Sequence, residues 1–127
     1  MKPLLGLMLV SLLGFAQEPV SKPPSAWWVH GSVFAHLTFA AMDGLSSWKQ
    51  GEGNVIYQQN SGIYAGRFYR SGAARLTGIT LSFGAASELL GILHPKWRRY
   101  ISGANLGAAG AHVGVTVSNI ARNPYYR

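Results

Sequence analysis

Three stretches of mostly apolar residues divide the chain, at 29–48, 74–93 and 100–121. A helix rises 1.5 Å per residue, so about twenty residues cross the roughly 30 Å hydrocarbon core of a bilayer. Within each stretch, polar and small residues recur at spacings of three, four and seven, which is the helical period. The pattern predicts an all-α integral membrane bundle of three transmembrane helices in a domain covering 27–127.

The segments around these stretches predict an exported N-terminus. Residues 1–16 are typical of a signal peptide, with a Lys near the start and a short apolar run, and they could be cleaved or kept as a signal anchor. Residues 17–26 hold three of the six prolines and predict an extended linker. Residues 49–73 predict a polar loop, functional or disordered, whose tyrosines favour the membrane interface.

Composition supports a membrane location. Charged residues make up 12% of the chain, about half the share of a typical soluble domain, and there are sixteen glycines. The mean hydropathy of +0.12 is low for a membrane protein because Gly, Ser and the polar loop dilute the spans. The net charge of +7 comes from basic residues at the ends of the apolar stretches, where lipid head groups lie. The expected partner is therefore the lipid bilayer and not nucleic acid, and no cysteine is present for thiol chemistry.

The basic residues also predict an orientation. If the signal exports residue 17, the middle loop and the C-terminus are cytoplasmic, with seven of the eleven Lys and Arg inside and four outside. The cluster between Lys96 and Arg99 is the exception. We expect a bacterial inner membrane protein with an exported N-terminus and a cytoplasmic C-terminus.

Titratable and amide side chains fall at matching depths in the predicted helices. A lone carboxylate at mid-helix costs about 2.5 to 3.5 kcal/mol on insertion scales, so it must pair, meet water or take up a proton. Threading the three spans brings two residues to each of three levels. The sequence thus predicts an intramembrane polar cluster of His36, Asp43, Glu88, Asn105, His112 and Asn119.

Three interpretations of this cluster stay open. The groups could hydrogen-bond across the bundle at roughly 0.6 to 2 kcal/mol each. They could form a proton or cation relay along Asp43, His36, His112 and Glu88. The two histidines and a carboxylate could bind a metal, although no HxxxH or HExxH spacing supports this. No nucleophile motif or phosphate loop occurs, so neither catalytic residues nor a cofactor is predicted.

The third span carries a ridge of glycines on a different face. Overlapping small-xxx-small patterns of this kind allow close contact between membrane helices. They predict an accessory or assembly component that packs against a partner or a second copy, and the alternative is a proton or cation conduit. A further alternative is a small outer-membrane β-barrel, although roughly 110 residues after the signal are few for eight strands. The ridge consists of Gly103, Gly107, Gly110 and Gly114.

A resemblance to known proteins rests on a few positions between the first and second spans: Asp43, Ser46, Ser47, Glu52-Gly53-Asn54 and Gly66-Arg67. The chain resembles small, uncharacterised bacterial multi-span membrane proteins in which an Asp ends the first span and a Glu-x-Asn-Pro element opens the next loop. The likeness covers about residues 36 to 121, and this chain has Val55 in place of the Pro. The resemblance implies a membrane fold of a few helices, with Glu52 and Asn54 as a loop motif, and it implies no reaction.

Overall fold

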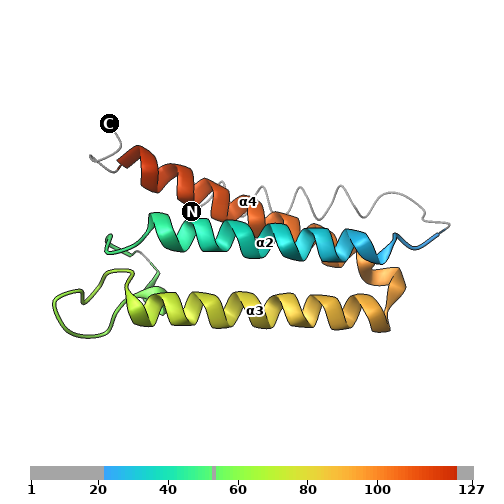
Figure 1. Ribbon diagram of the computed structural model, residues 1–127, viewed down its shortest axis with the longest axis horizontal. Helices are drawn as coiled ribbons and strands as arrows, with labels where there is room; N and C mark the ends of the chain where they lie inside the picture. Colours follow the sequence, from blue (N-terminus) through green and yellow to red (C-terminus); the bar gives the residue numbers. More distant parts are fainter. Residues whose placement is uncertain (1–21, 53, 123–127) are drawn as a thin grey trace.

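The structure, a computed structural model, describes residues 22–52 and 54–122. It consists of three helices, α2 (Ala26–Ser46), α3 (Arg70–Leu93) and α4 (Arg98–Arg122), with two short 3-10 turns, η1 (Val55–Tyr57) and η2 (Pro95–Trp97) (Figure 1). The described residues form isolated β-bridges but no extended strand, which confirms the predicted all-α class. The β-barrel alternative does not agree with this structure. The expected signal peptide and the first part of the expected linker lie outside the described residues.

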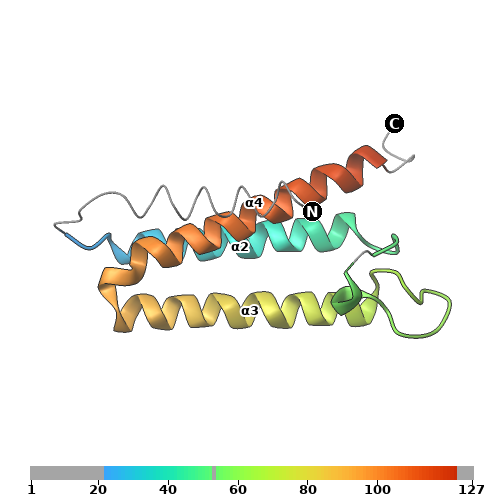
Figure 2. The same cartoon turned by 180° about the vertical axis from the view of Figure 1, so that it is seen from behind.

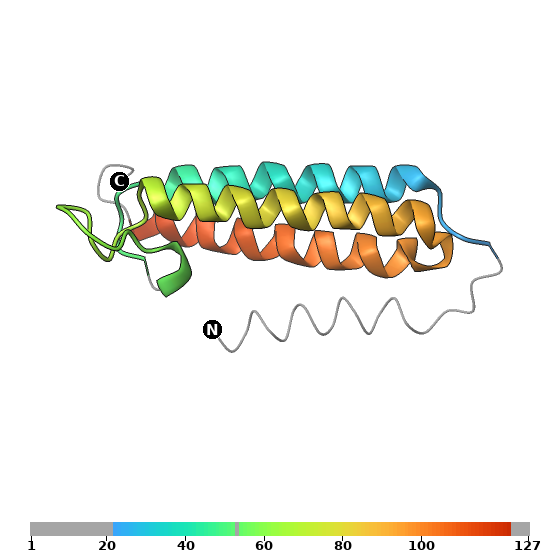
Figure 3. The ribbon, with the colours of Figure 1, turned by 90° about the horizontal axis from the view of Figure 1, so that it is seen from below.

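The helices lie side by side with α2 as the central element. α2 packs most extensively against α4 and less against α3, whereas α3 and α4 share few contacts. α3 and α4 are close at the turn that joins them and separate toward the other end of the bundle (Figures 1 and 2). Seen from below, all three run along one axis, with α3 antiparallel to its two neighbours (Figure 3).

The contact between α2 and α4 follows a heptad-like spacing. Residues buried or half-buried along each helix recur in steps of three and four, the pattern that keeps one stripe facing a neighbouring helix. The contact is unusual because polar side chains occupy many of these positions. We call it the α2–α4 seam; α2 contributes Val29, Ser32, Val33, His36, Ala40, Asp43 and Ser47, and α4 contributes Ser102, Asn105, Ala109, His112, Thr116 and Asn119.

α3 approaches α2 closely because it places glycines at the contact. A Cβ added at Gly84 would lie 3.2 Å from Val33 Cγ1, and one at Gly91 would lie 3.1 Å from Val29 Cγ2. Valines on α2 thus fill the space that α3 leaves empty. Val33 is buried beside Val29 and Ile101.

The helix ends are satisfied largely by distant residues. Ser25 caps α2 by accepting a hydrogen bond from the Trp27 N–H, but Tyr69 gives α3 no side-chain cap. Instead, Gln59 Oε1 accepts bonds from the N–H and the hydroxyl of Ser71, at 3.1 and 2.7 Å. At the other end, Arg98 of α4 donates to the carbonyl of Gly91 on α3 and to that of Pro24, in the segment just before α2.

The loop between α2 and α3 folds over the end of the bundle. Backbone bridges join Gly51 to Arg67 and Gln58 to Phe68, and Phe68 is 2% exposed beneath the loop. The ring of Trp48 packs against Phe68 with centroids 6.4 Å apart. The described part of this loop is therefore an ordered cap.

Among the described helices, α3 alone qualifies as a candidate membrane span when length and apolar composition are the only criteria. α2 and α4 are long enough, at 21 and 25 residues, but carry the polar residues of the seam. The three helices correspond in order to the apolar stretches at 29–48, 74–93 and 100–121.

Candidate functional site

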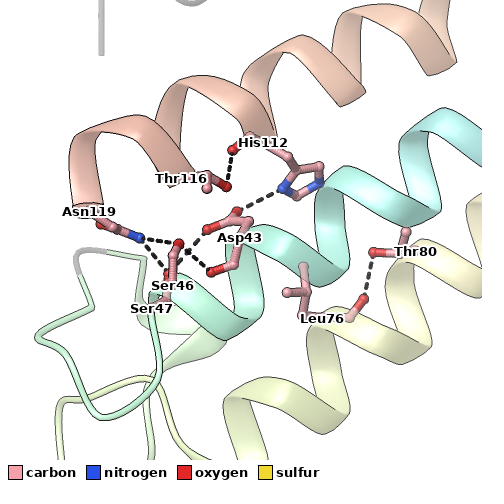
Figure 4. Close-up of polar contacts among 8 residues, drawn as sticks. All are labelled: Asp43, Ser46, Ser47, Leu76, Thr80, His112, Thr116 and Asn119. Carbon is pink, nitrogen blue, oxygen red and sulfur yellow. Dashed lines mark hydrogen bonds and ion pairs between the residues drawn. The ribbon is translucent and has the colours of Figure 1, made fainter. Parts of the chain in front are cut away.

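An Asp–His pair lies at the centre of the polar seam. Asp43 Oδ2 on α2 and His112 Nδ1 on α4 are 2.7 Å apart, and both side chains are more than four-fifths buried (Figure 4). The other carboxylate oxygen accepts a hydrogen bond from the Ser47 hydroxyl at 3.1 Å. The carboxylate of Asp43 is thus held from both sides, which offsets much of the cost of its burial.

Asn119 extends this network toward the loop end of the bundle. Its Nδ2 donates to Ser47 Oγ at 2.7 Å and to Ser46 Oγ at 3.2 Å (Figure 4). Asn119 therefore reaches Asp43 through the Ser47 hydroxyl. The sequence placed Asp43 and Asn119 at one depth, and the serines that connect them come from the last turn of α2.

A second network is built around Asn105, whose side chain is fully buried. Asn105 Nδ2 donates to Ser87 Oγ at 2.9 Å and to the Ile101 carbonyl at 3.0 Å, and its Oδ1 lies 3.2 Å from His36 Nδ1. One amide thus links α2, α3 and α4. Ser87 belongs to the polar face of α3 that helical spacing reveals.

The two histidines connect these networks. The rings of His36 and His112 are stacked, with centroids 5.5 Å apart and planes inclined by 23°. Phe83 on α3 meets the His36 ring edge-on at 5.4 Å. The sequence placed both histidines near the midplane, and the structure brings them into contact.

Hydrogen bonding fixes which nitrogen of each ring carries the proton. His112 Nδ1 faces the carboxylate of Asp43. His36 Nδ1 faces Asn105 Oδ1, and Asn105 Nδ2 already donates both of its hydrogens, to Ser87 and to the Ile101 carbonyl. In each neutral ring, Nδ1 therefore donates and Nε2 keeps its lone pair. Each neutral ring can therefore accept one hydrogen bond through Nε2.

Both rings line a groove of about 290 Å³ between α3 and α4, where these helices separate. Apolar side chains and the small residues of α4 form most of its walls, and Tyr57 from η1 also lines it. Burial, and then the charges of Asp43 and Glu52, raise the pKa of the Tyr57 phenol. The phenol therefore remains a hydrogen-bond donor. A larger groove of about 440 Å³ between α2 and α3 has no titratable side chain in its lining.

Glu88 does not join the predicted cluster. Its carboxylate lies 2.6 Å from His30 Nδ1, in a partly exposed contact near the start of α2. Consecutive helical residues differ by about 100° in direction, so the position that faces the seam belongs to Ser87 instead. The expected relay through Glu88 is thus interrupted, and His30 is a partner that sequence reasoning missed.

The loop motif has a local structural role. Glu52 Oε1 accepts the Asn54 N–H at 2.8 Å, and Asn54 Oδ1 accepts the Ile56 N–H at 3.1 Å. These bonds shape the turn that leads into η1 and bring Tyr57 to the groove.

The glycine ridge of α4 is divided between two environments. Gly103 is buried, and Gly103 and Gly107 line the groove beside the histidines. Gly110 and Gly114 are exposed, and a Cβ at either would have no atom within 4 Å. The second half of the ridge has no neighbour within the described bundle.

The described residues contain no group of three or more carboxylates and histidines that could hold a metal ion. The sequence-based metal hypothesis needed a carboxylate ligand beside the histidines. Asp43 instead binds the Nδ1 atom of His112 and leaves Nε2 facing elsewhere.

The chain has no match among known protein families, curated proteins or solved structures.

Proposed function

We propose that the protein is a small integral membrane protein in which α2, α3 and α4 each cross the bilayer, and that it acts as an accessory or assembly component. The observation that carries this proposal is the distribution of polarity. Among the described residues, polar side chains outnumber apolar ones at buried positions, whereas Phe34, Leu45 and Ile92 are 73, 77 and 64% exposed. Water disfavours such an arrangement, and lipid favours it.

Helix lengths and aromatic residues also support the proposal. Helices of 21, 24 and 25 residues are about 31 to 37 Å long, enough to span the hydrocarbon core. Trp27 and Trp28 lie exposed at the start of α2, and Trp48 lies just beyond its end. Tryptophans at both ends of a helix are typical of the two membrane interfaces.

The polar composition of α2 and α4 is compatible with spanning because their polar groups bind each other. Asp43 meets His112, and His36 meets Asn105, so these side chains are turned away from lipid. Paired polar groups lose most of the insertion penalty that each would have alone.

Replacing an outward apolar residue distinguishes a membrane bundle from a water-soluble one. Phe34→Asp places a carboxylate on the lipid side of α2, which costs roughly 3 kcal/mol at mid-helix, so membrane-integrated protein should fall sharply. The control Asn60→Asp, in the exposed loop, should integrate like the wild type. Resistance to alkaline extraction measures integration. A wild-type protein released as a soluble species, or a well-integrated Phe34→Asp variant, would contradict the proposal.

The accessory role rests on the open half of the glycine ridge. Gly110 and Gly114 form a flat exposed surface on α4, and surfaces of this kind let a second helix approach closely. The proposed partner is a neighbouring transmembrane helix, from a second copy of the chain or from another membrane protein.

Matched glycine substitutions test this role. Gly110→Leu should weaken association several-fold while leaving the bundle intact, since nothing in the bundle lies within 4 Å of the new Cβ. Gly78→Leu adds the same side chain at an equally open position on α3 and should leave association unchanged. Cross-linking in native membranes, followed by identification of the linked species, measures association. Equal behaviour of the two variants would argue against the docking face.

A second candidate function is a proton or cation conduit. A chain of contacts favours it, because intramembrane ionisable groups mark ion paths. The chain runs through Asn119, Ser47, Asp43, His112, His36 and Asn105. In proteoliposomes with an internal pH indicator, Asp43→Asn should abolish flux. Glu52→Gln, the same change in the loop, should preserve it. Absence of flux through the wild-type protein would exclude this function.

A further inference from the structure

Three residues that line the groove between α3 and α4 each have a polar atom without a hydrogen-bond partner among residues 22–52 and 54–122. The Nδ1 atoms of His36 and His112 are engaged on the seam, but neither Nε2 atom has a hydrogen bond to any described residue. The Tyr57 hydroxyl also lacks one, although the residue is half-buried. Polar groups in a largely apolar groove normally have partners, so these three are available to a ligand.

The hydrogen-bonding roles of these three groups, as donors or acceptors, determine which ligand groups can bind them. Because Nδ1 of each imidazole donates, each neutral Nε2 is an acceptor and requires a donor from the ligand. The Tyr57 phenol donates and requires an acceptor. A hydroxyl group meets both requirements, since it gives one hydrogen bond and accepts another.

The shape of the groove favours a flat ring. Its volume of about 290 Å³ suits a molecule of one or two rings, and the Phe83 ring forms part of one wall. Apart from His112, α4 lines the groove with glycine and alanine alone, at Gly103, Ala104, Gly107 and Ala108, so this wall has few projecting side chains. A planar apolar molecule can lie between an aromatic side chain and such a surface.

We propose that this groove binds a small hydroxylated aromatic molecule, a phenol or hydroquinone, whose hydroxyl donates to an imidazole Nε2 and accepts from Tyr57. The site goes beyond the docking role of α4, because it uses the inner glycines and the histidines and not the open half of the ridge. In such a site, the buried carboxylate of Asp43 holds the His112 imidazole in the tautomer whose Nε2 accepts a hydrogen bond.

Binding of naphthol to the purified full chain in detergent tests this proposal. We expect saturable binding of one molecule per chain, and at least tenfold weaker binding of its methyl ether, which keeps the ring but cannot donate. His36→Leu should weaken naphthol binding about tenfold by removing one acceptor. Equilibrium dialysis measures the affinities, and circular dichroism checks that each variant keeps its helical content.

A groove-filling variant keeps the test valid if His36→Leu does not fold. Ala108→Leu fills the groove and should reduce naphthol binding at least tenfold, whereas Ala85→Leu, the same change at an exposed position of α3, should not. Equal binding of naphthol and its methyl ether would overturn the proposal, as would unchanged binding to Ala108→Leu. Binding of zinc ion alone, with no binding of naphthol, would also overturn it and assign the Nε2 lone pairs to a metal.

Discussion

Some hydroxyl groups along the α2–α4 seam have a hydrogen-bond partner and others have none among the described residues. Thr116 Oγ1 donates to the His112 carbonyl at 2.8 Å, whereas Ser102 Oγ is buried and has no partner among the described residues. A buried polar atom without a hydrogen bond keeps its full desolvation cost, typically about 1 to 3 kcal/mol. The seam therefore contains both stabilising and destabilising hydroxyls within four helical turns.

Removing these two hydroxyls should have opposite effects. Ser102→Ala removes an unsatisfied group and should raise the free energy of unfolding by up to about 1 kcal/mol. Thr116→Val keeps the shape of the side chain but loses a bond, and should lower the free energy of unfolding by about 0.5 to 1 kcal/mol. Thermal unfolding in detergent, followed by circular dichroism, measures both. Destabilisation by Ser102→Ala would mean that its hydroxyl has a partner after all.

The Tyr57 phenol should make stability depend on alkaline pH. Burial and the charges of Asp43 and Glu52 raise its pKa in the folded protein above the ordinary value of about 10. The folded state then holds a proton that the unfolded chain releases, so stability falls as pH rises from about 10 toward the folded pKa.

Tyr57→Phe should remove this part of the alkaline loss of stability, and Asp43→Asn should reduce it by removing one of the charges. The unfolding temperature, measured from neutral to alkaline pH, gives the slope for each variant. Tyr100→Phe, which removes an exposed phenol, is the control and should follow the wild type. A Tyr57→Phe slope equal to that of the wild type would contradict the assigned pKa shift.

At the scale of elements, α3 depends on the loop for its start. The helix lacks a cap from Tyr69, and Gln59 supplies one by accepting two hydrogen bonds from Ser71. A side chain twelve residues away in sequence thus replaces the usual local cap. The ordered loop and the first turn of α3 are coupled as one unit.

Gln59→Ala should therefore destabilise both the loop and the start of α3. We expect a loss of about 1 kcal/mol, the typical cost of removing a helix cap, and faster amide hydrogen exchange over the first turn of α3. Asn60→Ala, at the exposed neighbouring position, should change neither quantity. Unchanged exchange in Gln59→Ala would show that α3 begins independently of the loop.

Helical periodicity predicted the elements well because it reports which residues share a face. The seven-residue spacing of Asn105, His112 and Asn119 placed them on one stripe, and all three now lie on the seam. Periodicity does not say which of two adjacent residues faces a neighbour, so Glu88 was assigned the place that Ser87 takes. It also gave no signal for the loop, whose order depends on hydrogen bonds between residues distant in sequence.

At the scale of the whole molecule, charge is unequal between the two ends of the bundle. The end that carries the loop has five basic residues within the described chain, and the end with the α3–α4 turn has four. Arg98, one of the four at the turn, donates hydrogen bonds to the carbonyls of Gly91 and Pro24. The positive-inside rule then favours a cytoplasmic loop by a narrow margin.

Because the chain lacks cysteine, single introduced thiols can report this orientation. Asn60→Cys marks the loop and Lys96→Cys marks the turn, and both positions are exposed. A membrane-impermeant maleimide should label Lys96→Cys in intact spheroplasts and Asn60→Cys only after lysis. Lys96→Cys also removes one positive charge from the exported end, which strengthens the expected orientation. The reverse labelling would invert the topology, and labelling of both thiols from outside would show that α3, the helix between them, does not cross the membrane.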